Sequence, residues 1–257
     1  MKYSVLTYLF GDYGKLHELP FENTNPNVEY VCVTDKKELK SNTWTIIYDE
    51  TLNCEYLNGF DKTFVTRYNP FKYCKSDICV RIDSSITPMF NLDDLVDKFI
   101  DGNYDIAINL HPDNVNIISE LYNWKLHRGI DQIELQTSYI ENTLKYDVMY
   151  NGGLYQVGLQ ILRNNPTVNK LNKDMIETLY DCTPKRNHVN RLDQTLFTAL
   201  FNKKYADKLK IMPLSWNLFC YGGMFRYTFH NTDKIINFPS TKFKHILNGE
   251  NVNAYGQ

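Results

Sequence analysis

The sequence predicts an α/β protein in which a central sheet of short strands is flanked by helices. Short apolar runs rich in Val, Ile and Tyr recur along the chain, and amphipathic stretches with helical periodicity lie between them. Several of these runs stop at turn residues such as Asp and Gly. Strands that alternate with helices in this way favour a layered sheet.

Five strands are predicted in the first part of the chain, over residues 3–9, 29–33, 43–48, 78–82 and 104–110. A helix over residues 64–74 is interrupted at Pro70, because proline has no backbone N–H to continue it. A second helix covers residues 91–100, where Asn91 can cap the start, acidic residues follow and Gly102 ends the helix.

The second part begins with a mostly helical segment over residues 115–144, broken near Gly129. A strand over residues 154–162 and two helices over residues 166–180 and 191–203 follow, and the tail from Lys204 is mixed strand and loop. We expect one domain over residues 1–257, because a chain of this length can bury a full core without disulfides or a structural metal.

The composition is that of an ordinary globular protein. Hydrophobic residues make up 43% and charged residues 23%, and a formal net charge of -2 gives no global attraction to nucleic acid or an anionic membrane. The six cysteines form no Cys-x-x-Cys pair, which indicates a reducing compartment. With no signal peptide and no apolar run long enough to span a bilayer, we expect a cytoplasmic, soluble protein.

Three predicted strands end in an acidic residue, at Asp35, Asp49 and Asp83. Taken alone, each fits a turn better than a ligand, because aspartate favours turns. In open α/β sheets, however, ligands bind beyond the carboxyl ends of the strands. We therefore expect a binding site at this edge of the sheet.

The segment Cys79-Val80-Arg81-Ile82-Asp83-Ser84-Ser85 delivers a carboxylate to this edge, followed by two small residues. Mg²⁺ and Mn²⁺ prefer oxygen ligands, and a nucleotide diphosphate supplies several of them, so the protein needs to add only one or two carboxylates. Small residues after Asp83 would let a donor sugar approach the backbone. An ordinary Asp-Ser turn is the competing interpretation.

Ile82-Asp83-Ser84-Ser85-Ile86 resembles the variant Asp-x-Asp motif of a GT-A family of bacterial, phage and plant glycosyltransferases, in which the pattern reads Ile-Asp-Gly-x-Ile. Ser85 stands where the second acidic residue of Asp-x-Asp would be. The resemblance implies a GT-A (Rossmann-like) mixed central sheet flanked by helices. It also implies Mn²⁺ or Mg²⁺, held by Asp83 with phosphates and water; a site that works without metal is the alternative.

Further segments extend the resemblance to about Phe201. They are Thr34-Asp35, Trp44, Arg67 with Pro70, His111-Pro112, Ser119-Glu120, residues 153–163 and Arg191-Leu192-Asp193-Gln194. The segment Tyr150-Asn151-Gly152-Gly153 is also similar to the Asn-Ser-Gly segment of glycogenin-like enzymes, in which glycine lets the backbone approach the donor sugar. Asp193-Gln194 is similar to the Asp-Gln pair that lies near the anomeric carbon in those enzymes.

The resemblance implies Asp83 and Asp193 as catalytic residues, Asp83 as the metal ligand and His111 as an acceptor contact. The implied donor-binding residues are Thr7, Tyr8, Asp35, Arg67, Lys72, Asp83, Ser85, Asn151, Gly152, Gly153 and Gln194. Tyr8 would stack on uracil, whereas Arg67 and Lys72 would face the diphosphate. A core tyrosine, a turn residue and a solvated charge are the ordinary alternatives. Later in the chain, Lys242 is a further phosphate-binding candidate, and His230 and His245 are further metal-ligand candidates.

The expected function is transfer of a hexose from a nucleotide diphosphate-sugar, UDP-linked, to an acceptor hydroxyl. A donor-binding half would span residues 1–110, approximately, and an acceptor half residues 111–257. A non-catalytic nucleotide-sugar or glycan-binding module on the same fold is the alternative. A nucleotidyltransferase is disfavoured, because the chain has no Gly-rich phosphate loop followed by Lys. A glycan, a protein and a modified DNA base all stay open as acceptors, and so does the oligomeric state.

Overall fold

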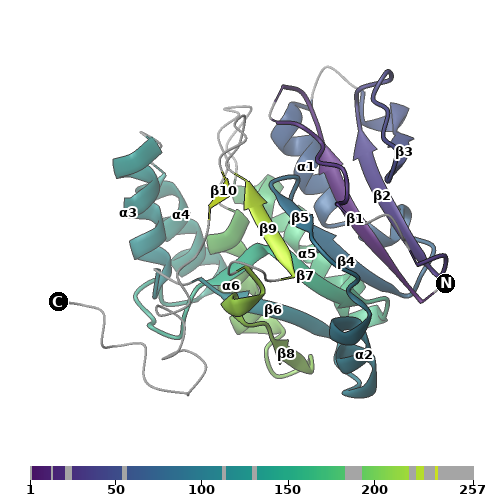
Figure 1. Cartoon of the computed structure of the whole chain (residues 1–257). Coiled ribbons are helices and arrows are strands. Elements are labelled where there is room, and N and C mark those ends of the chain that lie inside the picture. The colour runs from purple at the N-terminus through teal and green to yellow at the C-terminus, as the bar shows by residue number, and fades with distance from the viewer. Residues whose placement is uncertain are drawn as a thin grey trace.

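The computed structural model describes residues 2–12, 14–20, 25–53, 57–111, 114–128, 132–182, 193–219, 224–228 and 235–236. Its centre is a seven-stranded sheet in the order β3-β2-β1-β4-β7-β6-β8 (Figure 1). The predicted fold class, an α/β chain with a mixed central sheet flanked by helices, is confirmed.

The strands of this sheet are β1 (Tyr3–Leu9), β2 (Val28–Thr34), β3 (Thr45–Tyr48), β4 (Ile78–Ile82), β6 (Ile106–Leu110), β7 (Tyr155–Arg163) and β8 (Ile211–Pro213). Strand β7 runs antiparallel to both its neighbours, β4 and β6, whereas the other pairings are parallel. The carboxyl ends of β1, β2, β3, β4 and β6 therefore meet the start of β7 at one edge of the sheet.

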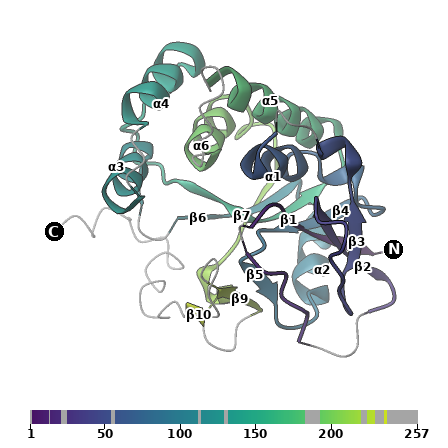
Figure 2. The ribbon, with the colours of Figure 1, turned by 90° about the horizontal axis from the view of Figure 1, so that it is seen from above.

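Helices cover both faces of the sheet (Figure 2). One face carries α1 (Gly59–Arg67), α3 (Ile117–Arg128), α4 (Ile133–Tyr139), α5 (Pro166–Cys182) and α6 (Asp193–Lys204). The other face carries α2 (Asp93–Asp101) and a small sheet of β5 (Ile86–Pro88), β9 (Phe225–Thr228) and β10 (Ile235–Ile236). The short helical segments are η1 (Glu50–Leu52), η2 (Pro70–Lys72), η3 (Ile140–Leu144) and η4 (Trp216–Phe219).

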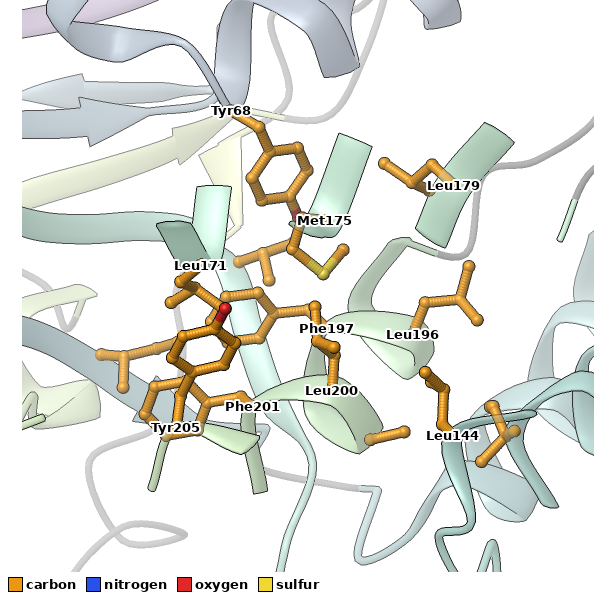
Figure 3. Close-up of a cluster of buried hydrophobic side chains, with 14 of the residues drawn as sticks. Tyr68, Leu144, Leu171, Met175, Leu179, Leu196, Phe197, Leu200, Phe201 and Tyr205 are labelled. Atoms are coloured by element: carbon orange, nitrogen blue, oxygen red, sulfur yellow. The ribbon is translucent and has the colours of Figure 1, made fainter. Parts of the chain in front are cut away.

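Successive side chains of a strand point to opposite faces of the sheet, so the core is divided between these two layers. Ile161 of β7 packs in the cluster that contains α2, whereas its neighbour Leu162 packs in the cluster that contains α5 and α6. Figure 3 shows the second cluster, in which Phe197 and Phe201 of α6 are stacked with their ring centroids 5.4 Å apart. Tyr68 belongs to the same cluster, so the core reaches the carboxyl edge of the sheet.

Most expected elements form within a few residues of their predicted bounds, and β1 and β4 match them. The helix predicted over residues 64–74 is misplaced: α1 begins at Gly59, ends at Arg67 and is followed by η2 at Pro70. Asn58 explains this start, because its side chain accepts hydrogen bonds from the N–H groups of Phe60 and Asp61 as a helix cap. Strand β5 was not predicted.

Four cysteines in the described residues, Cys32, Cys74, Cys79 and Cys182, are free thiols. Among the helices that the structure describes, none combines the length and the apolar character that crossing a membrane requires. The seven-stranded sheet contains strands from both sides of residue 110, because β7 and β8 lie beside β4 and β6.

Candidate active site

A cavity of about 670 Å³ opens at the edge where β1, β4 and β6 end and β7 begins. Its wall combines the segments that follow β1, β4 and β6 with the start of β7 and with side chains of α1, α3 and α6. This is the edge at which the acidic strand ends led us to expect a binding site. The residues of the wall come from distant parts of the chain, so only the folded sheet brings them together.

Asp83 lies on this wall directly after β4. Its backbone N–H donates to the carbonyl of Gly158 at 2.8 Å, and its own carbonyl accepts from the N–H of Ile86 at 2.8 Å. A Cβ at position 158 would lie only 3.1 Å from Oδ2 of Asp83. The turn after β4 therefore holds Asp83 against β7, and glycine at position 158 leaves room for its carboxylate.

Arg67, the last residue of α1, joins the two carboxylates of the site. Its Nη2 donates to Oδ1 of Asp83 at 2.5 Å, its Nη1 donates to Oδ2 of Asp193, and its Nε donates to the hydroxyl of Tyr8 at 2.7 Å. Burial would lower the pKa of Arg67, but the carboxylates of Asp193 and Asp83 outweigh it and raise that pKa above its ordinary value. The guanidinium therefore stays charged between Asp83 and Asp193, which are far apart in the sequence.

Two buried tyrosines complete the contacts of these carboxylates. The hydroxyl of Tyr8 donates to Oδ1 of Asp83, and the hydroxyl of Tyr68 donates to Oδ2 of Asp193 at 3.0 Å. Burial raises the pKa of both tyrosines above the ordinary value, so both hydroxyls keep their protons and act as donors. Each carboxylate thus receives one charged and one neutral hydrogen bond at a single oxygen.

Arg81 lies beneath this arrangement and is 1% exposed. It precedes Asp83 by two residues, so both side chains leave β4 on the same face. Its Nη1 donates to the backbone carbonyl of Arg67, its Nη2 donates to Oε1 of Gln160, and its guanidinium lies 5.0 Å from the ring centroid of Tyr68. Arg81 therefore ties the end of α1 to the strands below the site.

Asp83 keeps one oxygen open toward the cavity. Oδ1 accepts from Tyr8 and Arg67, whereas Oδ2 accepts no hydrogen bond from the residues that the structure describes, and the side chain is 27% exposed. One carboxylate oxygen suits a hard cation whose other ligands are phosphate and water oxygens, so the residues present fit such an ion. Within the described ranges, no group of three or more His, Cys, Asp or Glu is arranged to hold a metal.

Carboxylates outnumber cationic side chains at the cavity. Asp12, Asp83, Glu120 and Asp193 line it, and Arg67 is the one Lys or Arg among the lining residues in the described part of the chain. A diphosphate would add further negative charge to this wall. Its binding at this wall requires positive charge beyond that of Arg67, because like charges at short range repel each other.

Glu120 of α3 organises another part of the wall. Its Oε1 accepts from Nε1 of Trp124 at 2.7 Å and from Nε2 of Gln194 at 3.1 Å, and its Oε2 accepts from Nδ2 of Asn114. Burial raises the pKa of Glu120, and the hydrogen bonds from Trp124 and Asn114 offset only part of this rise. The backbone N–H of Asn114 also donates to Nδ1 of His111 at 3.0 Å, which links this residue to the same network.

The segment after β1 is positioned by Asp35, which lies behind the wall. Oδ1 of Asp35 accepts from the N–H of Gly11 at 3.1 Å, and Oδ2 accepts from Nζ of Lys62 at 2.8 Å. Gly11 has a φ of +56°, a left-handed conformation that favours glycine, and it lines the cavity. Asp35 therefore shapes the wall through Gly11.

The structure brings six of the residues predicted from sequence to the cavity, namely Tyr8, Arg67, Asp83, His111, Asp193 and Gln194. The others lie away from the described lining. Thr7 is buried within β1, Lys72 pairs with Asp49 at 2.7 Å, and Ser85 is buried and accepts from the N–H of Thr228 through its carbonyl.

The glycine-containing turn before β7 also lies outside the described lining of the cavity. Asn151 and Gly152 are exposed, and Oδ1 of Asn151 accepts from Nδ2 of Asn116 at 2.7 Å. Gly153 has a φ of +91°, which glycine adopts without strain. Arg191, His230, Lys242 and His245 lie outside the described residues.

Several residues of this arrangement were not predicted as site residues, and Arg81, Glu120 and Trp124 are three of them. Arg81 is a charged residue inside the apolar run of β4, and that contrast is a usable signal, because a buried charge needs partners. Glu120 was noted only as part of the resemblance, and Trp124 follows it by one helical turn, so the two share a face of α3. The contact between Trp124 and Glu120 could have been inferred from that spacing.

No protein-family model matches the chain, and no curated protein matches it in sequence. Several solved structures share parts of its arrangement. Mouse xyloside xylosyltransferase 1 is 13% identical over 83% of this chain and 85% of that protein, with a TM-score of 0.45.

The bifunctional glycosyltransferase WbbM is 13% identical over 83% of this chain and 38% of its own, also with a TM-score of 0.45. A glucose-1-phosphate thymidylyltransferase from Bacillus anthracis is 9% identical over 88% of this chain and 89% of its own, with a TM-score of 0.37. At these values the function has to be argued from the site itself.

Proposed function

We propose that the protein is a glycosyltransferase that moves a sugar from a nucleotide diphosphate-sugar, with UDP as the nucleotide, to an acceptor hydroxyl. The observation that carries this proposal is the pair Asp83 and Asp193. Two carboxylates from distant parts of the chain are fixed by one buried guanidinium at the wall of a cavity on the carboxyl edge of the sheet. The sequence resemblance around Asp83 points to the same chemistry.

The diphosphate would bind beside Asp83. A divalent cation, Mn²⁺ or Mg²⁺, would be held by Oδ2 of Asp83 together with phosphate oxygens, and it would supply the positive charge that a departing diphosphate requires. Arg67 holds Oδ1 of the same carboxylate, so the open oxygen is presented in one orientation. In this proposal Tyr8 also positions Asp83, because its hydroxyl is already engaged there.

Asp193 would act near the anomeric carbon as an electrostatic stabiliser. Its Oδ2 accepts hydrogen bonds from both Arg67 and Tyr68, and its side chain is 5% exposed. Two donors at one oxygen hold this carboxylate in one orientation beside the cavity. A fixed negative charge of this kind stabilises the positive charge that develops on a sugar ring during transfer.

The proposal is tested with a panel of UDP- and GDP-sugars, with Mn²⁺, with Mg²⁺ and with a chelator, by calorimetric titration and by release of the nucleotide diphosphate. We expect binding and turnover of a UDP-sugar that the chelator lowers. Asp83→Asn should reduce turnover at least about a hundredfold, since it removes a charge at the reacting centre. Asp101→Asn, an exposed aspartate at the end of α2, is the matched control.

The proposal would be refuted if no UDP- or GDP-sugar of the panel were bound or turned over. Full activity of Asp83→Asn would contradict the role of Asp83 alone.

A non-catalytic nucleotide-sugar or glycan-binding module is the second candidate. It is favoured by Ser85, which is buried and leaves Asp83 without a second carboxylate two residues later. Tight binding of a UDP-sugar without product, whichever acceptor is added, would favour the module.

A further inference from the structure

Two of the free thiols lie in contact with each other. Cys74 follows η2 and Cys79 lies on β4, and the thiol of Cys74 donates to Sγ of Cys79 with the two sulfur atoms 3.4 Å apart. Of the four cysteines that the structure describes, these are the two that meet, whereas the thiol of Cys32 donates to the carbonyl of Val33. Neither Cys74 nor Cys79 belongs to the described lining of the cavity, so their contact serves no step of the proposed transfer.

The two sulfur atoms need only a small movement to form a bond. A disulfide has an S–S distance of about 2.05 Å, so the sulfur atoms would have to approach each other by about 1.4 Å. Strand β4 is held on both sides, since Cys79 lies opposite Ser4 of β1 and Leu162 of β7. Cys74 lies before β4 in a segment outside helices and strands, which is less constrained. We therefore expect Cys74 to make most of this movement.

The two thiols differ in exposure, and this difference sets the order in which they react. Cys79 is buried among side chains of β1 and β2, whereas Cys74 is partly exposed. Burial raises the pKa of the Cys79 thiol, so this thiol keeps its proton and is a poor first nucleophile. An oxidant from solvent therefore meets Cys74 first, and Cys79 lies in position to react second.

We propose that Cys74 and Cys79 are a reversible modification site, at which a low-molecular-weight disulfide of the glutathione class converts the two thiols into a disulfide. The bond would join the segment after η2 to β4. The site lies outside the cavity of the proposed glycosyl transfer and does not depend on that function.

The reaction has two exchange steps. The thiolate of Cys74 attacks one sulfur of the oxidant, forms a mixed disulfide with it and displaces one thiolate, which takes up the proton that Cys74 lost. Sγ of Cys79 then attacks Sγ of Cys74 and displaces the second thiolate, which takes up the proton of Cys79. The two protein thiols thus lose two electrons and two protons, and the oxidant becomes two thiols. A dithiol reductant reverses both steps.

The disulfide is tested on the unaltered, folded protein. The reduced protein is placed in buffers with different ratios of oxidised to reduced glutathione, blocked with N-ethylmaleimide and digested with trypsin. Trypsin cleaves after Lys75, so reduced Cys74 and Cys79 appear on separate blocked peptides, whereas the disulfide joins residues 73–75 to residues 76–81 in one species that mass spectrometry identifies. We expect the joined species in oxidising buffer and its loss on treatment with dithiothreitol.

Three results of this experiment would overturn the proposal. The first is that both peptides stay separate and blocked at every ratio. The second is that Cys74 carries glutathione without passing it on to form the bond with Cys79. The third is a disulfide that joins Cys74 to a different cysteine of the chain.

The fold, and not only the short separation in sequence, should favour the bond. At a fixed concentration of reduced glutathione, half of the protein should be oxidised at a concentration of oxidised glutathione at least about tenfold lower in buffer than in denaturing urea, because the fold already places the sulfur atoms together. An equal or higher concentration for the folded protein would show that the native structure opposes the bond, and would refute the site.

The order of attack is tested with single substitutions. Cys79→Ala should trap glutathione on Cys74 and raise the amount of this mixed disulfide at least about fivefold, because the second thiol is gone. Cys74→Ala should leave Cys79 as a thiol, and glutathione on Cys79 in that variant would contradict the order. Cys32→Ala is the matched control, since it also removes a buried strand cysteine and should form the disulfide as the unaltered protein does. The measurements on the unaltered protein stay decisive if Cys79→Ala fails to fold.

Discussion

The two oxygens of Asp83 have different surroundings, and this asymmetry is the feature from which the site can be understood. Oδ1 receives Arg67 and Tyr8, whereas Oδ2 lies close to Gly158 and faces the cavity. A carboxylate that is anchored at one oxygen can present the other without losing its orientation. Residue 158 then controls the space around the presented oxygen.

Gly158→Ala tests this interpretation directly. The new Cβ would lie 3.1 Å from Oδ2 of Asp83, closer than an ordinary contact, so the carboxylate must move. We expect the affinity for a UDP-sugar with Mn²⁺ to fall about tenfold, or about 1.4 kcal/mol. Replacing glycine by alanine in an extended segment restricts the unfolded chain, so the free energy of unfolding should stay constant or rise slightly.

Calorimetric titration and urea unfolding measure the two quantities. Gly14→Ala is the control, because the nearest atom to its Cβ would be at an ordinary 3.9 Å. A Gly158→Ala protein that binds the donor as well as the unaltered protein would show that Oδ2 plays no part in binding.

At the scale of single elements, β4 carries the site on one face. Val80 and Ile82 pack in the cluster around α2, whereas Cys79 packs on the opposite side, where Arg81 and then Asp83 also lie. The alternation of β4, continued by one residue beyond its end, thus places the buried cation of Arg81 and the cavity-lining carboxylate of Asp83 on the same side. Arg81 in turn fixes the carbonyl of Arg67 at the end of α1.

Removing Arg81 should therefore destabilise the fold. In Arg81→Met, the methionine fills much of the volume of the arginine side chain but leaves the carbonyl of Arg67 and Oε1 of Gln160 without their donor. We therefore expect the free energy of unfolding to fall by about 3 kcal/mol. Equilibrium unfolding in denaturant measures this change in the free energy of unfolding. Arg163→Met on the neighbouring strand β7, where the arginine is only partly buried, should cost less. Equal stabilities of the two variants would contradict the structural role of Arg81.

At the scale of the whole molecule, acid should unfold the protein partly through Asp49. Burial raises the pKa of Asp49, but hydrogen bonds from Lys72, Thr51 and Tyr73 outweigh it and hold that pKa well below its usual range. A carboxylate with a lower pKa in the folded state stabilises the fold above its unfolded pKa of about 3.9, and this contribution is lost as the pH falls through the folded pKa.

Asp49→Asn should thus lower the free energy of unfolding at pH 7 by about 1–3 kcal/mol, because charged hydrogen bonds are replaced by weaker ones. The difference between the two proteins should shrink as the pH falls below about 4. Urea unfolding at a series of pH values measures this difference. A difference that stays constant down to the lowest pH would rule out the assignment to Asp49.

Most strands could be predicted from the sequence alone, because an apolar run and the aspartate that ends it are local signals. The sequence was also sufficient to select Asp83 and Asp193 as candidates, through segments that resemble a known pattern. It could not reveal that Arg67 joins the two, because that contact spans 126 residues and depends on how α1 and α6 pack. Nor could it separate Lys72, which pairs with Asp49, from Arg67, since both are cations within the same predicted helix.

The position of β7 has a consequence for the synthesis of the protein. This strand lies between β4 and β6 in the sheet, although it follows both of them in the sequence and is synthesised after them. Until the ribosome has released residue 163, the nascent chain carries two unpaired inner strand edges, which are templates for association with other chains. Asp83 likewise lacks the carbonyl of Gly158 until then. The first 110 residues, expressed alone, should therefore aggregate instead of forming a smaller stable sheet.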